Sequence, residues 1–427
     1  MPGILLLVKM GWRNLWRNPR GTLLTALALG LGLALLLISL GLLDGLHEKM
    51  IGDGVRFGTG HVVIQAQGYQ DSGSQELLVP AQVVSTTEEF LHTEPMKHLV
   101  RGMSPRLLAS GLLSSAANAA GVGIIGILPK EERVVSLIPS RIVEGNNLSD
   151  DEQSGVVIGA ELARKLEVKV GSKVVLMTQA VQQAKPEAAD EGGMQSTLLR
   201  VSGIFRTGVQ AVDAQVIHLL LPVAQTLLGV PGRVTQVAIL LHRESDSQMV
   251  ARDLRKQLAG LAVEVLPWRE SMPRLVQIFR LDETFNYVMN GVVLAMVGLG
   301  ILNTILMRVL ERHYEFGLCK ALGLRPLQLA GIIIGESLAL TTVSLALGLA
   351  LGSSVHYYVS TFGLDLHWLV KGSLPSSFVF DPIIYSRLSL SRIASSVSIV
   401  FLTTTVISFY PALKAARTEL PDALKVF

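Results

Sequence analysis

Four long apolar runs divide the chain. Each lacks Asp, Glu, Lys and Arg, and the runs cover residues 21–43, 284–307, 337–355 and 393–413. A helix needs about 20 apolar residues to cross roughly 30 Å of hydrocarbon. We therefore predict four transmembrane helices, over residues 21–45, 283–307, 327–355 and 393–413. The third begins before its apolar run, so it contains Glu336.

The segment between the first two predicted helices has a different pattern. Strand-like alternation occurs in residues 60–69, 198–205 and 236–241. Strand and helix signals follow one another in residues 156–179 and 216–229, and residues 247–261 have helical spacing. This pattern predicts an α+β domain over residues 46–282, of one or two lobes. Residues 179–197 are polar and cannot build a core.

The Lys and Arg residues of the short segments predict the orientation in the membrane. The N-terminal segment, the segment between the second and third helices, and the C-terminal tail carry four, four and three of them: Lys9, Arg13, Arg17, Arg20; Arg308, Arg312, Lys320, Arg325; Lys414, Arg417, Lys425. The loop over residues 356–392 carries three: Lys371, Arg387 and Arg392. Both termini are therefore expected in the cytoplasm, and the α+β domain on the outside.

Residues 1–20 have the pattern of an amphipathic helix. Trp12 and Trp16 lie on the apolar face, whereas Lys9, Arg13 and Arg17 lie on the other. Tryptophan opposite basic residues suits a helix that lies in the headgroup layer. The sequence predicts such an interfacial helix on the cytoplasmic side.

Residues 308–326 form a short, densely charged hairpin between two predicted spans. Leu310, Tyr314, Leu318 and Ala321 recur at helical spacing, with charges between them. Charges of this density cannot lie in hydrocarbon, so the hairpin must project into water. Two interpretations remain open at this point: a solvated loop that sets topology, or a helix that docks on a cytoplasmic partner.

The predicted spans also carry small and polar residues. Small residues recur at four-residue spacing, which permits close helix packing: Ala26, Gly30, Ala34; Gly291, Ala295; Ser344, Gly348, Gly352. Asn290 and Glu336 are costly to expose to lipid. We expect both to face protein or a cavity, with a basic neighbour or a backbone partner for Glu336.

Composition excludes several classes of function. The chain is 49% hydrophobic and 17% charged, and its net charge is only +3. With Cys319 as its one cysteine it cannot form an internal disulfide, and no metal-ligand cluster stands out. Sequence motifs for phosphate-binding loops, zinc proteases and serine hydrolases are absent. We expect a non-enzymatic membrane protein with no cofactor or metal of its own and no nucleic-acid partner.

Several motifs resemble one known family. These are E-R-H-Y-E-F-G-L-C-K-A-L-G over residues 311–323, Y-P-A-L-K-A-A-R-T-E-L-P-D-A-L-K over residues 410–425, G-H-V-x-I at Gly60, E-G-N-x-L at Glu144, V-V-I-G-x-x-L-A at Val156 and V-x-G-I-F-x-T-G at Val201. Together with the layout of spans, they resemble the FtsX/MacB/LolC-LolE class of ABC-transporter permeases, and most closely its lipoprotein-releasing branch. The resemblance covers nearly the whole chain.

This resemblance implies a bacterial inner-membrane permease with a periplasmic domain. It implies two ATPase subunits, which bind ATP and Mg, and a second permease, identical or paralogous. A lipoprotein substrate, membrane lipid and a periplasmic lipoprotein carrier complete the expected partners. The hairpin would be the ATPase-coupling segment, with the following residues as its contacts: Glu311, Arg312, Glu315, Gly317, Lys320 and Gly323.

The resemblance further implies an acyl-chain cavity lined by the first and second spans. Apolar residues at helical spacing are the candidates: Leu33, Leu37 and Leu40 in the first span, and Phe285, Val288, Met289, Val292 and Met296 in the second. These stripes could equally pack on each other or on the partner permease. A carrier-binding hairpin would lie at Lys185 and Pro186.

Two alternative functions stay open at this stage. One is a MacB-like exporter of peptides or amphiphiles. The other is an FtsX-like mechanical regulator of a periplasmic hydrolase, which moves no substrate.

Overall fold

The computed structural model describes residues 13, 16–17, 19–181, 193–365 and 383–417. It divides into two compact units. We call Glu48–Ile278 the outer domain, and the described residues of 1–47, 279–366 and 383–427 the membrane unit. The predicted Lys185–Pro186 hairpin and the interfacial helix before Arg13 lie outside the described residues.

Among the described residues, four helices are long and apolar enough to cross a membrane, as predicted. They are α2 (Pro19–Phe57), α12 (Pro273–Glu311), α14 (Pro326–Phe362) and α16 (Leu390–Arg417). All four extend beyond the predicted spans, so residues 356–362 and 414–417 are helical and not loop or tail. The reason is physical: charges mark where hydrocarbon ends, whereas backbone hydrogen bonds can continue the helix into water.

Close packing of α2 on α14 depends on small residues. A Cβ added to Gly348 would lie 2.7 Å from the Gly30 carbonyl oxygen and 2.9 Å from Leu33 Cβ. Leu37 packs in the same way against Gly352. Leu33 and Leu37 are therefore only 1% exposed, and they belong to the core between the helices.

Replacing Gly348 by leucine should push α2 away from α14. Overpacking of a tight contact costs about 1–3 kcal/mol, so the melting temperature of the purified protein in detergent should fall. Gly300→Leu is the matched control, because a Cβ at Gly300 of α12 meets nothing within 4 Å. Equal melting temperatures for the two variants would contradict the close contact.

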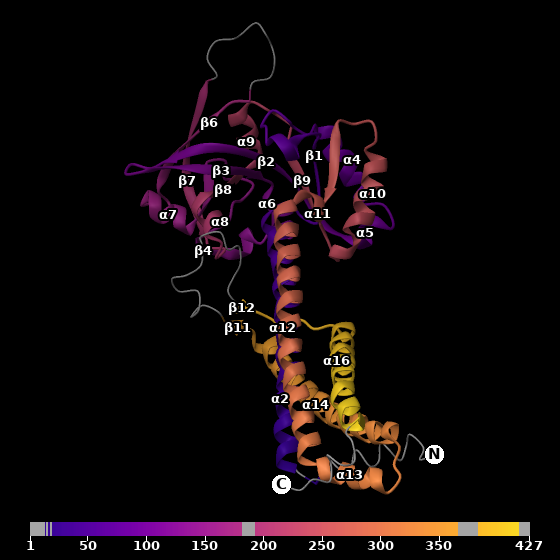
Figure 1. Cartoon of the computed structure of the whole chain (residues 1–427). Coiled ribbons are helices and arrows are strands. Elements are labelled where there is room, and N and C mark those ends of the chain that lie inside the picture. Colours follow the sequence, from indigo (N-terminus) through magenta and orange to yellow (C-terminus); the bar gives the residue numbers. More distant parts are fainter. Residues whose placement is uncertain (1–12, 14–15, 18, 182–192, 366–382, 418–427) are drawn as a thin grey trace. The chain divides into compact units, whose positions relative to one another are not determined.

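The outer domain is an α+β structure around one ten-stranded sheet (Figure 1). Its strands are β1 (Val62–Ala66), β2 (Val100–Ser114), β3 (Ala119–Ile127), β4 (Ile142–Gly145), β5 (Gly155–Gly159), β6 (Lys173–Gln179), β7 (Met194–Phe205), β8 (Val216–Leu220), β9 (Gln236–Leu241) and β10 (Val263–Pro267). The strand order is β10-β1-β9-β2-β3-β8-β5-β7-β4, and β6 pairs with β2 and β7.

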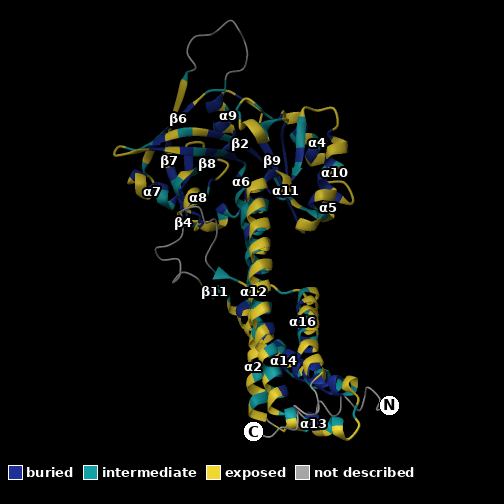
Figure 2. Cartoon of the chain, viewed as in Figure 1, coloured by how far each residue is buried: buried dark blue, intermediate teal, exposed yellow. Residues whose placement is uncertain are grey.

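Short helices accompany this sheet. They are α3 (Tyr69–Ser72), α4 (Ala81–Leu91), α5 (Met96–Leu99), α6 (Pro129–Val135), α7 (Ala160–Leu166), α8 (Gln210–Gln215), α9 (Leu221–Leu228), α10 (Ser247–Gln257) and α11 (Trp268–Ser271). The strand and helix signals of the sequence fall on β1, β5–α7–β6, β7, β8–α9, β9 and α10. Figure 2 shows buried residues concentrated along the strands.

The long strand β2 joins two parts of the sheet. Its first half, from Val100 to Arg106, pairs with β9, and its second half, from Leu107 to Ser114, pairs with β3. One hydrophobic core includes residues of both parts, from Val62 to Val265. The outer domain is thus one compact unit whose two parts share a strand.

A buried ion pair lies where β2 meets α6. Arg106 Nη2 and Glu132 Oε1 are 2.9 Å apart, and both side chains are almost fully buried. Ser104 Oγ donates to the same carboxylate, and Arg106 also donates to the Gly58 carbonyl oxygen. Burial alone would raise the pKa of Glu132, but the charge of Arg106 and the hydrogen bonds that Arg106 and Ser104 donate to the carboxylate lower it. Nearby, burial lowers the pKa of His218 to about 4, so its imidazole is neutral.

Candidate functional site

The cytoplasmic end of the membrane unit is held together by one apolar cluster. The short helix α13 (His313–Ala321) connects α12 to α14 and inserts Phe316 into this cluster. Ile305 of α12, Ile333 of α14 and Ala412 of α16 surround it. The face of α13 that carries Phe316 is therefore buried. Helical geometry then places the residues two positions before and after Phe316 on the opposite face.

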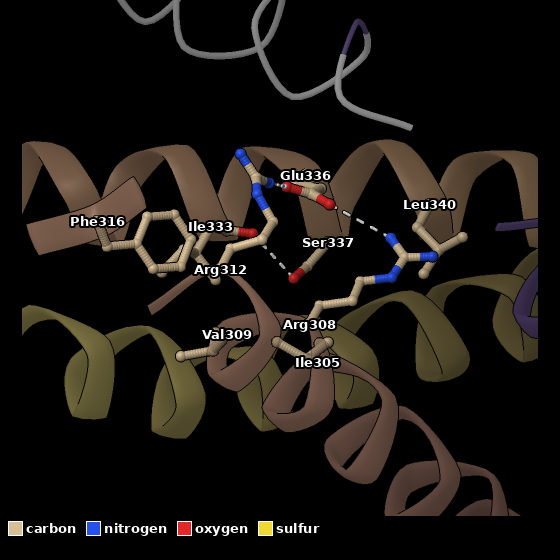
Figure 3. Close-up of a pocket in the computed structure, with 9 residues that line it drawn as sticks. All are labelled: Ile305, Arg308, Val309, Arg312, Phe316, Ile333, Glu336, Ser337 and Leu340. Atoms are coloured by element: carbon tan, nitrogen blue, oxygen red, sulfur yellow. Dashed lines mark hydrogen bonds and ion pairs between the residues drawn. The ribbon is translucent and has the colours of Figure 1, made fainter. Parts of the chain in front are cut away.

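Glu336 of α14 lies beside this cluster and bridges two arginines of α12. Figure 3 shows the Arg308 and Arg312 side chains pointing toward its carboxylate. Arg308 Nη1 is 3.3 Å from Glu336 Oε1, and Arg312 Nη1 is 3.2 Å from Oε2. The two arginines are four residues apart on one helix face, which places both against the same partner. Glu336 is 14% exposed and faces protein with basic neighbours, as predicted.

The charges continue from this pair to α13 and to the segment before α2. Arg312 Nε donates to Glu315 Oε2 at 2.8 Å, and Arg17 Nη2 donates to Glu315 Oε1 at 2.7 Å. The hydrogen bonds from Arg17 and Arg312 lower the pKa of Glu315. Arg308 also donates to Thr22 Oγ1 at 3.3 Å. We call Arg17, Glu315, Arg312, Glu336 and Arg308 the charge network.

The residues predicted as ATPase contacts of the hairpin lie in different surroundings. Glu315 belongs to the charge network, and Lys320 Nζ donates to the Ala416 carbonyl oxygen of α16 at 2.8 Å. Gly317 is buried, and Glu311 is exposed. Gly323 follows the end of α13 with a φ of +96°, a backbone conformation that favours glycine. Of the predicted contacts, Glu315 and Lys320 therefore bind this chain itself.

The face of α13 opposite Phe316 is apolar and exposed. Tyr314 is 56%, Leu318 48% and Leu322 78% exposed. Tyr314 and Leu318 lie four residues apart and share one face of α13. Leu322, directly after α13, and Leu310, near the end of α12, are exposed on either side of them. We call Leu310, Tyr314, Leu318 and Leu322 the α13 stripe. The helical spacing of Leu310, Tyr314 and Leu318 was visible in the sequence, whereas their exposure is a finding of the structure.

The predicted acyl-chain residues separate into two groups. Leu33 and Leu37 pack against α14 and are only 1% exposed, whereas Leu40 is half-buried. On α12 all five candidates are exposed: Phe285, Val288, Met289, Val292 and Met296. We call these five residues the α12 stripe. The exposed leucines of α2 are instead Leu23, Leu24, Leu31 and Leu35.

Other predicted positions carry less information. Asn290 is half-buried on α12. Within the described residues, no group of three or more His, Cys, Asp or Glu could hold a metal ion. Cys319 is a half-buried free thiol.

Comparisons with known proteins agree with the layout of spans and outer domain. The model for the MacB-like periplasmic core domain matches residues 22–257, and the model for the FtsX-like permease C-terminal domain matches residues 287–420. The chain is 22% identical to the lipoprotein-releasing system transmembrane protein LolC of Neisseria meningitidis, over 95% of this chain and 94% of that protein. It is 23% identical to LolE of Haemophilus influenzae, over 96% of both chains. Among solved structures it is similar to the periplasmic region of MacB from Actinobacillus actinomycetemcomitans, with a TM-score of 0.37 and 14% identity, over 53% of this chain and 95% of that one.

Proposed function

We propose a function from the premise that this chain belongs to the ABC-transporter permeases with a MacB-like periplasmic core domain and an FtsX-like C-terminal domain. Members of this family are multi-pass proteins of the inner membrane with a periplasmic domain, and they associate with ATPase subunits and a partner permease. The proposed function is the extraction of lipoproteins from the inner membrane, with hydrolysis of ATP and Mg binding in the separate ATPase subunits. A periplasmic carrier would receive the lipoprotein.

Similarity to LolC and LolE over nearly their whole length carries this proposal. The α12 stripe supports it, because an extracted acyl chain needs an apolar host. Each buried CH₂ contributes about 0.8 kcal/mol, so a chain leaves the bilayer only for a surface of comparable apolar area. Methionine next to branched side chains makes such a surface adaptable to chains of different length.

The charge network supports a route from the ATPase to the spans. Arg312 contacts Glu315 of α13 at 2.8 Å and Glu336 of α14 at 3.2 Å. A displacement of α13 would therefore change an ion pair inside the bundle. We infer that α13, docked through its exposed stripe, passes ATPase movement to α14 through this arginine.

Lipoprotein release by the reconstituted complex tests the proposal. Val292→Asp and Met296→Asp should each reduce ATP-dependent release at least tenfold, because a charge deep in an apolar host costs about 2.5–3.5 kcal/mol. Complex assembly and basal ATP hydrolysis should stay close to those of the unmodified complex. Val406→Asp, on an exposed position of α16, is the matched control and should retain release.

Normal release by both α12 variants, or an equal loss in the Val406→Asp control, would contradict a specific role of the α12 stripe. A second candidate function, export of peptides or amphiphiles, is favoured by the MacB-like core domain. Mass spectrometry of the cargo bound to the purified complex separates the two, since an acylated protein is expected only for lipoprotein extraction.

A further inference from the structure

A groove of about 420 Å³ lies on the outer domain, lined by α4, α5, β2 and α6. Its size is within the range of small-ligand sites, about 300–1,000 Å³. Apolar side chains such as Leu91, Met103 and Val134 contribute to its lining. The charged side chains around them are Glu88, His92, Lys97, Arg101, Lys130 and Glu131.

A β-bulge directs Arg101 into this groove. The pairing of β2 with β9 shifts between Val100 and Gly102, so Arg101 is the additional residue without a partner in the ladder. Bulges redirect a side chain in this way and are frequent beside binding sites. The adjacent Gly102 lets α6 approach, since a Cβ there would lie 2.7 Å from Val134 Cγ1.

The groove has unpaired positive charge. Lys130 Nζ is 2.8 Å from Asp150 Oδ2, but within the described residues Lys97 and Arg101 form no ion pair. These two exposed cations without an ion pair favour carboxylate groups in a ligand.

We propose that this groove binds an acidic peptide segment in an extended conformation. Its carboxylates would pair with Lys97 and Arg101, and its apolar side chains would cover Leu91, Met103 and Val134. Glu88 and Glu131 would accept backbone N–H groups of a peptide, which a phosphate or a lipid headgroup cannot offer in the same number. The proposal concerns the outer domain alone, so it holds for either cargo of the membrane unit.

Fluorescence anisotropy with the purified full-length protein tests this site. The first probe is a labelled eight-residue peptide in which glutamate and valine alternate. The second probe has glutamine in place of each glutamate, and a lysine version is made in the same way. The acidic peptide should bind at least tenfold more tightly, and high salt should weaken it. Lys97→Ala with Arg101→Ala should remove most of this preference. Arg133→Ala with Lys169→Ala, two exposed cations outside the groove, should leave it unchanged.

Charge reversal provides an independent arm. Lys97→Glu with Arg101→Glu changes exposed side chains, so the melting temperature should be retained, and the variant should prefer the lysine version of the peptide. Equal binding of the acidic and glutamine peptides would overturn the proposal, as would full binding by the double alanine variant. A third outcome would also overturn the proposal. In it, the parent protein shows no preference between the peptides but binds phosphatidylglycerol vesicles, and the double alanine variant loses this binding. The groove would then be a membrane-binding site.

Discussion

Leu318→Asp will detach the ATPase subunits from this permease. Leu318 is at the middle of the α13 stripe, where nearly half of its side chain is exposed. An exposed apolar stripe outside the membrane is typical of a protein interface, and truncation of an interface anchor costs at least about 2 kcal/mol. A buried carboxylate adds a desolvation cost. Co-purification of the ATPase should therefore fall more than tenfold, and the stimulated ATP hydrolysis with it.

Two further variants separate docking from folding. Glu311→Gln changes an exposed charge beside the stripe and should retain the ATPase. Glu315→Lys should instead lower the melting temperature of the isolated permease, because it places a third cation beside Arg17 and Arg312. If Leu318→Asp keeps the ATPase while Glu315→Lys loses it from a stable permease, the charged face is the dock after all.

Arg106→Met should unfold the outer domain at much lower denaturant concentration than the parent protein. The substitution removes the partner of Glu132, which is 1% exposed, and leaves a buried carboxylate without a counter-charge. Breaking a buried pair from one side costs about 3–5 kcal/mol. It also removes the donor to the Gly58 carbonyl oxygen. Denaturant unfolding of the full-length protein, followed by tryptophan fluorescence to which the buried Trp268 contributes, measures the loss.

The double variant Arg106→Met with Glu132→Leu is the control for this prediction. It replaces the pair by apolar side chains of similar size, which is often neutral or stabilising. It should therefore recover most of the stability lost by Arg106→Met alone. A single variant as stable as the parent would mean that water or a rearranged neighbour satisfies Glu132.

Local patterns in the sequence determined the layout of this protein. Four uncharged runs predict the four long helices, and the alternation of apolar and polar residues predicts strands such as β1 and β9. Small residues at four-residue spacing predicted close packing, which is observed where Gly30 meets Gly348. These features depend on neighbours within one or two turns, and the sequence contains that information directly.

Contacts between distant segments were decided only by the tertiary structure. Leu33 and Leu35 are both leucines of one apolar helix, yet only Leu33 is buried, because α14 packs on that side. Glu315 pairs with Arg17, which lies 298 residues away in the sequence. The burial of Phe316 exposes Tyr314 and Leu318 on the opposite face. The periodicity of a helix defines its faces, but which face is covered depends on a partner helix whose position no local pattern records.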